Sequence, residues 1–433
     1  MNTMLFDDIT VLRADGTVLP HQFVSVRDGR FDYIGTNRPA GAFDRVIPGS
    51  RFVLMPGLVN AHTHVPMTLM RGYGDDMPLQ SWLFDRIFPF EDQLSGDAVY
   101  WGSLLGIAEM LATGTTSFSD MYYFCDRIAD AVEESGIKAN IGRGISCFDE
   151  NQRFADLPAY RELVELLEQR QGAADGRIRI DVAPHSEYTT RPDILEDATA
   201  LAARYGARMQ VHVSETKSEH KECVGRHGKT PVRVLLDAGV LDQPVTIAHG
   251  VWLTDEDMDI LAAQGATVAH CAKSNLKLAS GIAQVTKWQK KGLSVAIGTD
   301  SAASNNRLDM LEEMRTASLL AKGVSLDPCA LPADQVLYMA TRAGALSQGR
   351  ADTGDIVPGY CADAVLLDGE NWSMSPRHSA LSNAVFAAAG QAVYMTMVDG
   401  RVVYENGEFP TLDMPRIRAE SDRCIREILQ KLD

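Results

Sequence analysis

The sequence predicts an α/β fold, a (β/α)8 TIM barrel combined with a small β-sandwich domain built from both chain ends. Three observations lead to this prediction: β-rich segments with hairpin signals at both termini, eight apolar runs that alternate with helical patterns between them, and polar residues at the carboxyl ends of those runs. We expect residues 1–54 and 351–433 to form the small domain, with a terminal helix, and residues 55–350 to form the barrel.

The terminal segments have the composition of short antiparallel strands. We expect β-prone runs at Met4–Leu12, Thr17–Val26, Arg30–Gly35, Ala362–Asp368 and within Ala392–Phe409. The turns between or within them are pairs that favour tight hairpins, namely Asp15-Gly16, Asp28-Gly29, Asp399-Gly400 and Asn406-Gly407. Segments from opposite chain ends can pair into one small sheet domain. Apolar spacing predicts a closing helix over Arg416–Leu432.

The middle of the chain alternates between short apolar runs and amphipathic patterns. The eight predicted strands are Phe52–Asn60, Thr115–Asp120, Lys138–Ile145, Ile178–His185, Arg208–Ser214, Pro244–His249, Ala266–His270 and Leu293–Asp300. Among the connecting helices we expect Asp97–Ala112, Arg191–Tyr205, Asp255–Gln264 and Leu308–Ala321. This alternation is typical of a parallel sheet, and eight repeats of the unit are typical of a barrel.

Several predicted barrel strands end in side chains that can bind or ionise. These residues are His62, His64, Asp120, Arg143, His185, His212, His249, His270 and Asp300. Six of the chain's ten histidines belong to this set, a larger share than chance placement would give. Because the carboxyl ends of barrel strands share one face, where active sites of such barrels lie, we expect a site there.

The composition excludes several classes of protein. The chain has 433 residues, of which 45% are hydrophobic and 23% charged, as in a soluble globular protein. With 41 basic and 58 acidic residues its formal charge is −17, so we expect no nucleic-acid partner. The sequence has no apolar run of about 20 residues that would predict a membrane span.

The cysteines and the first residues bear on cellular location. Seven cysteines lie at least 22 positions apart, which fits neither a paired metal knuckle nor a disulfide framework. Asp7 and Asp8 lie where a signal peptide would be basic or apolar. We therefore expect a reduced, cytoplasmic protein, without a membrane partner, and leave open whether it forms a homo-oligomer.

The His62-x-His64 spacing predicts half of a metal site, because period-2 spacing points both imidazoles the same way from one strand. An isolated pair of this kind is common and carries little weight. Here His212, His249 and Asp300 end other strands on the same face. Separately hydrogen-bonded core histidines are the alternative, but five such coincidences argue against it. We predict one divalent cation, most simply Zn2+, held by His62, His64, His212 and Asp300, which would lower the pKa of a water.

Three side chains near this predicted site have the chemistry of proton transfer. Asp300 can accept the proton of the water, and Glu215 can carry a proton to a ring nitrogen of the substrate. His249 can donate a hydrogen bond to the attacking oxygen and stabilise a tetrahedral intermediate. The alternative for Glu215 is a solvated loop acid.

These motifs resemble the mononuclear-metal branch of the amidohydrolase superfamily. The resemblance rests on the segments Pro56–His64, His212–Glu215, His249 and Gly298–Asp300. The binuclear branch of that superfamily has a carbamylated lysine at the end of the fourth strand, where this chain has His185. The resemblance therefore implies a single metal ion.

Further segments resemble the 5′-methylthioadenosine/S-adenosylhomocysteine deaminases over nearly the whole chain. They are Met67–Gly72, Trp82-Leu83, Phe90–Asp92, Ser274–Gly281, Ser301–Asn306 and Tyr404–Thr411. The resemblance implies that Glu91 accepts hydrogen bonds from ribose hydroxyls and that His185 meets the purine ring. It also implies that Arg143 and a second arginine, for which Arg153 is the candidate, contact the sugar or an amino-acid tail.

Each of these assignments has a plainer alternative. Glu91 and Arg153 can be solvated surface residues, Arg143 can belong to a structural ion pair, and His185 can be a hydrogen-bonded core histidine. Met67, Met70, Met77 and Trp82 can form an apolar wall for a thioether tail or simply pack in the core.

The sequence thus predicts a hydrolytic deaminase that converts adenine nucleosides to inosine-type products and ammonia. The nearest rival is the same barrel acting on another ring, as in guanine, pterin or chlorotriazine hydrolases, which need no acid for ribose. A second rival is a barrel that has lost catalysis and serves as a binding module, which should have lost metal ligands. The order of preference among S-adenosylhomocysteine, methylthioadenosine, adenosine and 5′-deoxyadenosine is left open.

Overall fold

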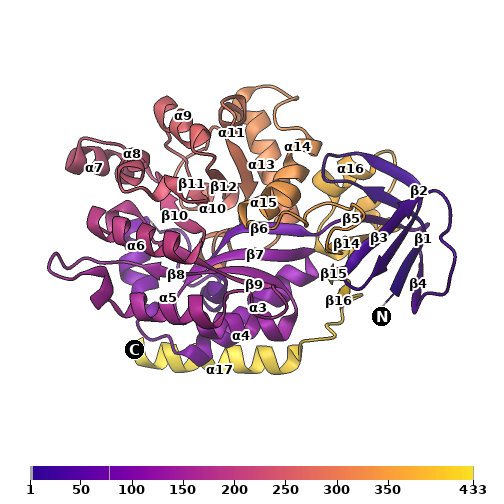
Figure 1. Ribbon diagram of the computed structural model, residues 1–433, viewed down its shortest axis with the longest axis horizontal. Helices are drawn as coiled ribbons and strands as arrows, with labels where there is room; N and C mark the ends of the chain where they lie inside the picture. The colour runs from indigo at the N-terminus through magenta and orange to yellow at the C-terminus, as the bar shows by residue number, and fades with distance from the viewer. Residues whose placement is uncertain (1–2, 78, 433) are drawn as a thin grey trace.

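The computed structural model describes residues 3–77 and 79–432 and contains two eight-stranded sheets (Figure 1). One sheet is parallel and forms the barrel, and the other is a separate sheet built from both ends of the chain. Figure 1 shows the small sheet at one end of the molecule and the barrel at the other. This arrangement confirms the predicted fold class.

The small sheet combines five N-terminal strands with three C-terminal ones. Its strands are β1 (Thr3–Leu12), β2 (Val18–Arg27), β3 (Arg30–Gly35), β4 (Arg45–Pro48), β5 (Phe52–Pro56), β14 (Ala364–Asp368), β15 (Val393–Val398) and β16 (Arg401–Glu405). Their order is β16-β15-β14-β5-β1-β2-β3, with β4 paired to β1. The antiparallel β5·β14 pair therefore joins the two chain ends.

Two of the predicted Asp-Gly turns meet in this sheet. Asp28 and Asp399 both have positive φ values, 50° and 46°, as tight hairpins require. A side chain on Gly400 would come within 3.0 Å of the Cα atom of Gly29, so the two hairpin tips pack against each other only as glycines.

The barrel strands run parallel in chain order. They are β6 (Leu58–Thr63), β7 (Thr115–Tyr122), β8 (Lys138–Ile145), β9 (Ile178–Pro184), β10 (Met209–Val213), β11 (Val245–His249), β12 (Thr267–His270) and β13 (Ser294–Ile297). Nearly all of their residues are buried, as expected for strands covered on both faces.

The strand predicted over residues 52–60 is wrong as a single element. Phe52–Pro56 forms β5 in the small sheet, and the barrel begins only with β6 at Leu58. Gly57 lies between them, where a side chain would come within 2.1 Å of Thr116 Oγ1. The run is apolar throughout because both sheets bury it, so hydrophobicity alone does not mark the change of sheet.

The barrel closes between its last and first strands. The Asp300 backbone N–H donates to the His62 carbonyl at 3.0 Å. Gly298 makes this approach possible, because a Cβ atom there would lie 2.9 Å from the His62 backbone nitrogen. Asn60 and Thr299 exchange two hydrogen bonds across the same seam, at 2.7 and 2.9 Å. The seam thus brings the end of β13 next to the His62-x-His64 motif.

Helices surround the strands of the barrel (Figure 1). The α-helices are α1 (Leu79–Trp82), α2 (Phe88–Glu91), α3 (Gly96–Ala112), α4 (Cys125–Ser135), α5 (Pro158–Gln169), α6 (Pro192–Tyr205), α7 (Lys217–His227), α8 (Pro231–Asp237), α9 (Asp255–Ala263), α10 (Ala272–Lys277), α11 (Val285–Lys290), α12 (Ala302–Asn305), α13 (Met310–Ser325), α14 (Ala333–Tyr338), α15 (Gly344–Ser347), α16 (Ala380–Ser382) and α17 (Met414–Leu432). None of the described helices is long and apolar enough to cross a membrane.

The terminal helix α17 packs on the barrel rather than on the small sheet, as Figure 1 shows. Ser421 donates to the Trp101 carbonyl of α3 at 3.4 Å, and Arg423 pairs with Asp97 at the start of α3. Its buried residues Ile417, Cys424 and Ile428 follow helical spacing, as predicted.

Candidate active site

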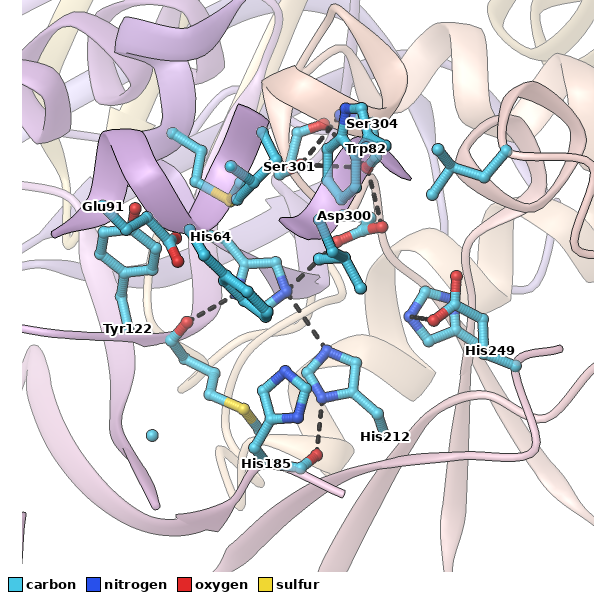
Figure 2. Close-up of a pocket in the computed structure, with 18 of the residues that line it drawn as sticks. His64, Trp82, Glu91, Tyr122, His185, His212, His249, Asp300, Ser301 and Ser304 are labelled. Atoms are coloured by element: carbon cyan, nitrogen blue, oxygen red, sulfur yellow. Dashed lines mark hydrogen bonds and ion pairs between the residues drawn. The ribbon is translucent and has the colours of Figure 1, made fainter. Parts of the chain in front are cut away.

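A pocket opens at the carboxyl ends of the barrel strands (Figure 2). Its polar lining consists of His64, Glu91, Tyr122, Tyr123, His185, Tyr188, His212, Glu215, His249, Asp300, Ser301 and Ser304. Its apolar lining includes Met67, Trp82, Leu83, Ile87, Phe88, Met121 and Leu278. A pocket lined by both apolar side chains and a set of polar groups is the usual construction of a small-molecule site.

The His62-x-His64 motif lies at the end of β6, beside the end of β13. The Nε2 atoms of His62 and His64 lie 3.7 and 3.3 Å from Asp300 Oδ1. His62 Nε2 is buried and has no hydrogen-bond partner. An orphaned imidazole nitrogen that faces a carboxylate is what a metal site without its ion presents.

His64 and His212 face each other through their Nε2 atoms, which are 3.3 Å apart (Figure 2). The Nδ1 of His64 bonds to the Met121 carbonyl at 2.6 Å, and the Nδ1 of His212 bonds to the His185 carbonyl at 2.7 Å. Each carbonyl accepts the Nδ1–H, so the neutral form of each ring keeps its lone pair on Nε2. A cation between them therefore fits these two residues.

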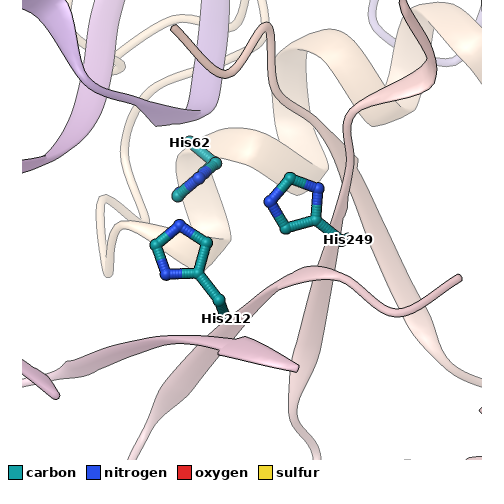
Figure 3. A group of neighbouring side chains, drawn as sticks. All are labelled: His62, His212 and His249. Carbon is teal, nitrogen blue, oxygen red and sulfur yellow. The ribbon is translucent and has the colours of Figure 1, made fainter. Parts of the chain in front are cut away.

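Two overlapping sets of three side chains could hold a metal ion, and both contain His62. One set is His62, His64 and Asp300, and the other is His62, His212 and His249 (Figure 3). Within each set the ligand atoms lie within 4.8 Å of one another. The predicted ligands His62, His64, His212 and Asp300 are thus brought together, and His249 borders the same space.

Burial and neighbouring charge set the protonation of this cluster. Burial, followed by repulsion from neighbouring imidazoles, holds the pKa values of His62 and His212 well below their usual range, so both rings are neutral. For His64, burial is outweighed by the hydrogen bond to Asp300, and its pKa rises to about 9. For Asp300, burial is outweighed by His64, and the pKa of the carboxyl falls well below its usual range. The cluster thus offers two neutral imidazoles, His62 and His212, beside an ion pair of His64 and Asp300.

Asp300 is held by two serines on the side away from the histidines. Its Oδ2 accepts hydrogen bonds from Ser274 at 2.5 Å and from Ser304 at 2.8 Å. This leaves Oδ1 to face His62 and His64. Asp300 also has a φ of 60°, an uncommon backbone conformation for a residue other than glycine.

Glu215 lies in the loop after β10, and its carboxylate reaches into the pocket. Its Oε1 accepts a hydrogen bond from Ser280 at 3.2 Å, and its Oε2 is 3.8 Å from His249 Nε2. The side chain of Glu215 is 13% exposed. Glu215 is therefore not the solvated loop acid of the alternative interpretation.

The backbone around Glu215 is fixed by a second acid, Glu219 in the first turn of α7. Glu219 accepts three backbone N–H groups, from Ser214 at 2.8 Å, Glu215 at 2.7 Å and Thr216 at 3.2 Å. Burial raises the pKa of Glu219 to about 7. Ser214 has a φ of 50°, so this loop is both unusual in conformation and closely held.

His249 ends β11 with a φ of 71° and points into the same space. Its Nδ1 donates to Asn275 Oδ1 at 2.9 Å, which leaves Nε2 to face Glu215. Burial opposes its protonation, but attraction to Glu215 and Asp300 is stronger, and its pKa is raised. A histidine in this state can donate from Nε2.

Glu91, in α2, and His185, just after β9, lie on opposite sides of the pocket opening (Figure 2). Burial raises the pKa of Glu91 to about 7, although the neighbouring Tyr122 hydroxyl acts in the other direction. Burial lowers the pKa of His185 to about 4, so its ring is neutral. The centroid of that ring is 4.6 Å from the centroid of the His212 ring.

The two predicted arginines are not part of the pocket lining. Arg143 packs its guanidinium 5.0 Å from the centre of the Tyr123 ring and pairs with Glu162, so one aromatic ring separates it from the cavity. Arg153 is 79% exposed and pairs with Asp156 at 2.9 Å. The loop that carries Arg153 runs along the surface, and the structure does not bring this residue to the site.

Sequence reasoning missed several residues of the site. Tyr122, Tyr123, Tyr188 and Leu278 line the pocket. Tyr122 is the last residue of β7 and Tyr123 follows it, so their position at a strand end could have indicated them. Nothing in the local pattern indicates Tyr188 or Leu278, because loop geometry places both. Of the apolar candidates, Met67 and Trp82 line the pocket.

A barrel that gathers imidazoles and a carboxylate at the carboxyl ends of its strands is the architecture of a metal-dependent hydrolase. The chain belongs to the amidohydrolase family, whose model matches residues 53–403.

Individual relatives are similar over most of the chain. A 5-methylthioadenosine/S-adenosylhomocysteine deaminase of Pelotomaculum thermopropionicum is 45% identical, with 88% of this chain and 87% of the relative covered. A 5′-deoxyadenosine deaminase of Methanothermobacter thermautotrophicus is 44% identical, with 94% of each chain covered. The crystal structure of an adenosine deaminase from Xanthomonas campestris with bound zinc is 34% identical, with a TM-score of 0.93 over 99% of this chain and 98% of that one.

Proposed function

We propose that this protein is a hydrolytic deaminase of adenine nucleosides, which replaces the 6-amino group by oxygen and releases ammonia. One observation carries the proposal: Glu215, His249 and Asp300 converge on the same pocket as the imidazole cluster, and Glu91 lies across that pocket. Relatives that are similar over most of the chain are deaminases of adenine nucleosides by name, which supports the same conclusion.

The residues that would hold a metal ion are His62, His64, His212 and Asp300. A bound divalent cation, Zn2+ in the first instance, supplies an acidified water for attack on the substrate. The unpartnered His62 Nε2 and the facing nitrogens of His64 and His212 support this assignment. His249, at the edge of the cluster, keeps its Nε2 toward Glu215 and is left for catalysis.

Glu215 and Asp300 transfer the protons of the reaction, and His249 donates a hydrogen bond. The oxygen of water bonds to C6 of the adenine ring, while Glu215 takes one proton from that water and delivers it to ring nitrogen N1. Asp300 accepts the second proton of the water and passes it to the amino group. His249 donates a hydrogen bond to the attacking oxygen while the tetrahedral centre exists. The C6–N bond then breaks, giving ammonia and a 6-oxo product protonated at N1.

The substrate would lie with its purine near His185 and its ribose toward Glu91. A neutral imidazole is suited to contact with an uncharged ring, and the low pKa of His185 keeps it neutral at pH 7. Glu91, as a carboxylate, can accept both ribose hydroxyls. Trp82, Met67 and Leu83 line the same pocket and offer apolar contact to a 5′ substituent. Arg143 would act on substrate only through Tyr123.

We also propose a cellular location for the protein. All seven cysteines are free among the described residues, and five of them are buried, which fits a reducing compartment such as the cytoplasm. Homo-oligomer formation stays an expectation that sedimentation can test.

The test is ammonia release from a panel of adenine nucleosides, guanine, a pterin and a chlorotriazine, with metal content measured on the same sample. We expect turnover of the nucleosides alone, with adenosine, 5′-deoxyadenosine, methylthioadenosine and S-adenosylhomocysteine compared as substrates. If a free base or a triazine were turned over and the nucleosides were not, the result would favour the rival hypothesis, in which the barrel acts on another ring.

A further inference from the structure

One short segment after β12 contacts all three proposed reacting side chains, although it contributes no metal ligand. This segment, residues 274–280, spans the end of α10 and the loop that follows. Ser274 donates to Asp300 Oδ2 at 2.5 Å, Asn275 accepts from His249 Nδ1 at 2.9 Å, and Ser280 donates to Glu215 Oε1 at 3.2 Å. Asp300 follows β13, His249 ends β11 and Glu215 follows β10, so the segment contacts residues at the ends of three different strands.

We propose that the 274–280 segment is a positioning element that sets the orientation of Asp300, His249 and Glu215 together. The proposal rests on the function proposed above for those three residues. Ser274, Asn275 and Ser280 lie one layer behind the pocket wall, so each acts through the residue it bonds rather than on the substrate.

Each contact leaves the working atom of its partner free. Ser274 binds the Asp300 oxygen that faces away from the histidines. Asn275 binds the His249 nitrogen that faces away from Glu215. The Asn275 side chain has no other partner in the described structure, because its Nδ2 is buried and unbonded. Ser280 binds one Glu215 oxygen and leaves the other toward His249.

The segment is itself held from behind. Trp252 donates from its indole N–H to the Ser280 carbonyl at 2.7 Å. Gly281 follows with a φ of 132°, and a Cβ atom there would lie 3.0 Å from Val251 Cγ1, so the chain turns against the β11 loop directly after Ser280. This backing converts three single hydrogen bonds into a fixed frame, which is what aligned proton transfer requires.

The first experiment separates positioning from packing through matched pairs of variants. Ser280→Ala and Asn275→Leu remove a hydrogen bond, whereas Ser280→Thr and Asn275→Asp keep it. We expect the first pair to lower kcat roughly 10- to 100-fold, the range seen when supporting shells are removed, with KM within about threefold of wild type. The second pair should recover most of the rate. The control is Leu276→Ala, because Leu276 is 41% exposed and is not part of the pocket lining.

A purely structural role would lower Tm and change KM and kcat together, without recovery in the conservative variants, and that result would overturn the proposal. Equal kcat in Ser280→Ala, Asn275→Leu and wild type would overturn it as well. If the wild-type protein deaminates none of the nucleosides, the proposed function is wrong, and the next measurement decides on the segment alone.

That measurement is the Zn2+ affinity of Ser274→Ala in competition with a chelator, which needs no substrate. We expect a loss of roughly tenfold, and recovery in Ser274→Thr. Ser304 still donates to Asp300 at 2.8 Å in both variants, so the loss should be partial. An unchanged affinity in Ser274→Ala would show that the segment does not position Asp300.

Discussion

The Nε2 atoms of His64 and His212 lie 3.3 Å apart at the mouth of the barrel, although 148 positions separate the two residues in the chain. The Nδ1 atoms of the two rings are hydrogen-bonded to the backbone carbonyls of Met121 and His185, respectively. Two lone pairs at this distance repel unless a proton or a metal ion lies between them. The fold therefore brings together, from the ends of β6 and β10, two nitrogens that could hold a cation.

Removal of one of these imidazoles tests the metal site. His212→Ala should bind less than one-tenth as much Zn2+ as wild type after dialysis and should lose at least about 10³-fold in kcat, since the acidified water is lost. Metal analysis and ammonia release on the same preparations check this. His270→Ala is the control, because His270 is a buried histidine at the end of β12 outside the pocket lining. Wild-type metal content in His212→Ala would contradict the assignment.

Glu91 should make nucleoside binding depend on pH. Its raised pKa of about 7 means that the carboxylate, which accepts ribose hydroxyls, is lost as pH falls through 7. We expect kcat/KM for adenosine to fall below that pH, and Glu91→Gln to have low kcat/KM with no such step. The comparison substrate is 2′,3′-dideoxyadenosine, which lacks both hydroxyls and should show a much smaller effect of Glu91→Gln. An equal loss on both substrates would remove the assigned role.

Glu219 should act through the Glu215 loop. Its carboxylate accepts three backbone N–H groups, and Glu219→Gln would turn a donor toward at least one of them. We expect kcat to fall roughly tenfold or more by analogy with other supporting residues. Glu222→Gln, on the same helix with a 62% exposed side chain, should have no effect. Steady-state kinetics of both variants decide the point, and equal rates would show that the loop keeps its shape without Glu219.

Arg153 should be dispensable. Its side chain is 79% exposed and occupied by Asp156, away from the pocket. Arg153→Ala should therefore change KM for S-adenosylhomocysteine, the substrate with a carboxylate tail, by less than about twofold, which is within the range of an exposed ion pair. A selective increase in KM for that substrate, without a change for adenosine, would show that the loop closes over the site in solution.

Glu313 should make thermal stability fall with rising pH. Burial raises its pKa to about 8, well above the usual range of a glutamate. An acid whose pKa is higher in the folded state stabilises the protein at low pH, and this contribution disappears between about 4.5 and 8. Glu313→Gln mimics the protonated acid and keeps the contact from Asn305. The Tm of the variant relative to wild type should rise by a few degrees from pH 5 to pH 8.5, and a constant difference would contradict the raised pKa.

Local sequence pattern was enough to predict the barrel and the side chains that cluster as candidate metal ligands. The strand Lys138–Ile145 has the predicted limits, because its apolar run is bounded by clear breaks. The positions of His62, His64, His212 and Asp300 follow from period-2 strands and from the common face of parallel strand ends.

Other features depend on tertiary structure and were not visible in the sequence. The boundary between β5 and β6 lies inside one apolar run, because two different sheets bury its halves. Whether Arg153 reaches the site could not be predicted, because the path of a long loop is not encoded by spacing. The contacts of Ser274, Asn275 and Ser280 join loops from different strands, and small polar residues of this kind have the same local signature as any turn.

The most direct test of the whole account is a metal titration of the metal-depleted protein, followed by ammonia release from adenosine. We predict that activity rises linearly with added Zn2+ and saturates at one equivalent per chain, and that His62→Ala binds no equivalent tightly. Full activity without bound metal, or saturation at two equivalents, would contradict the single cation site on which the proposed chemistry depends.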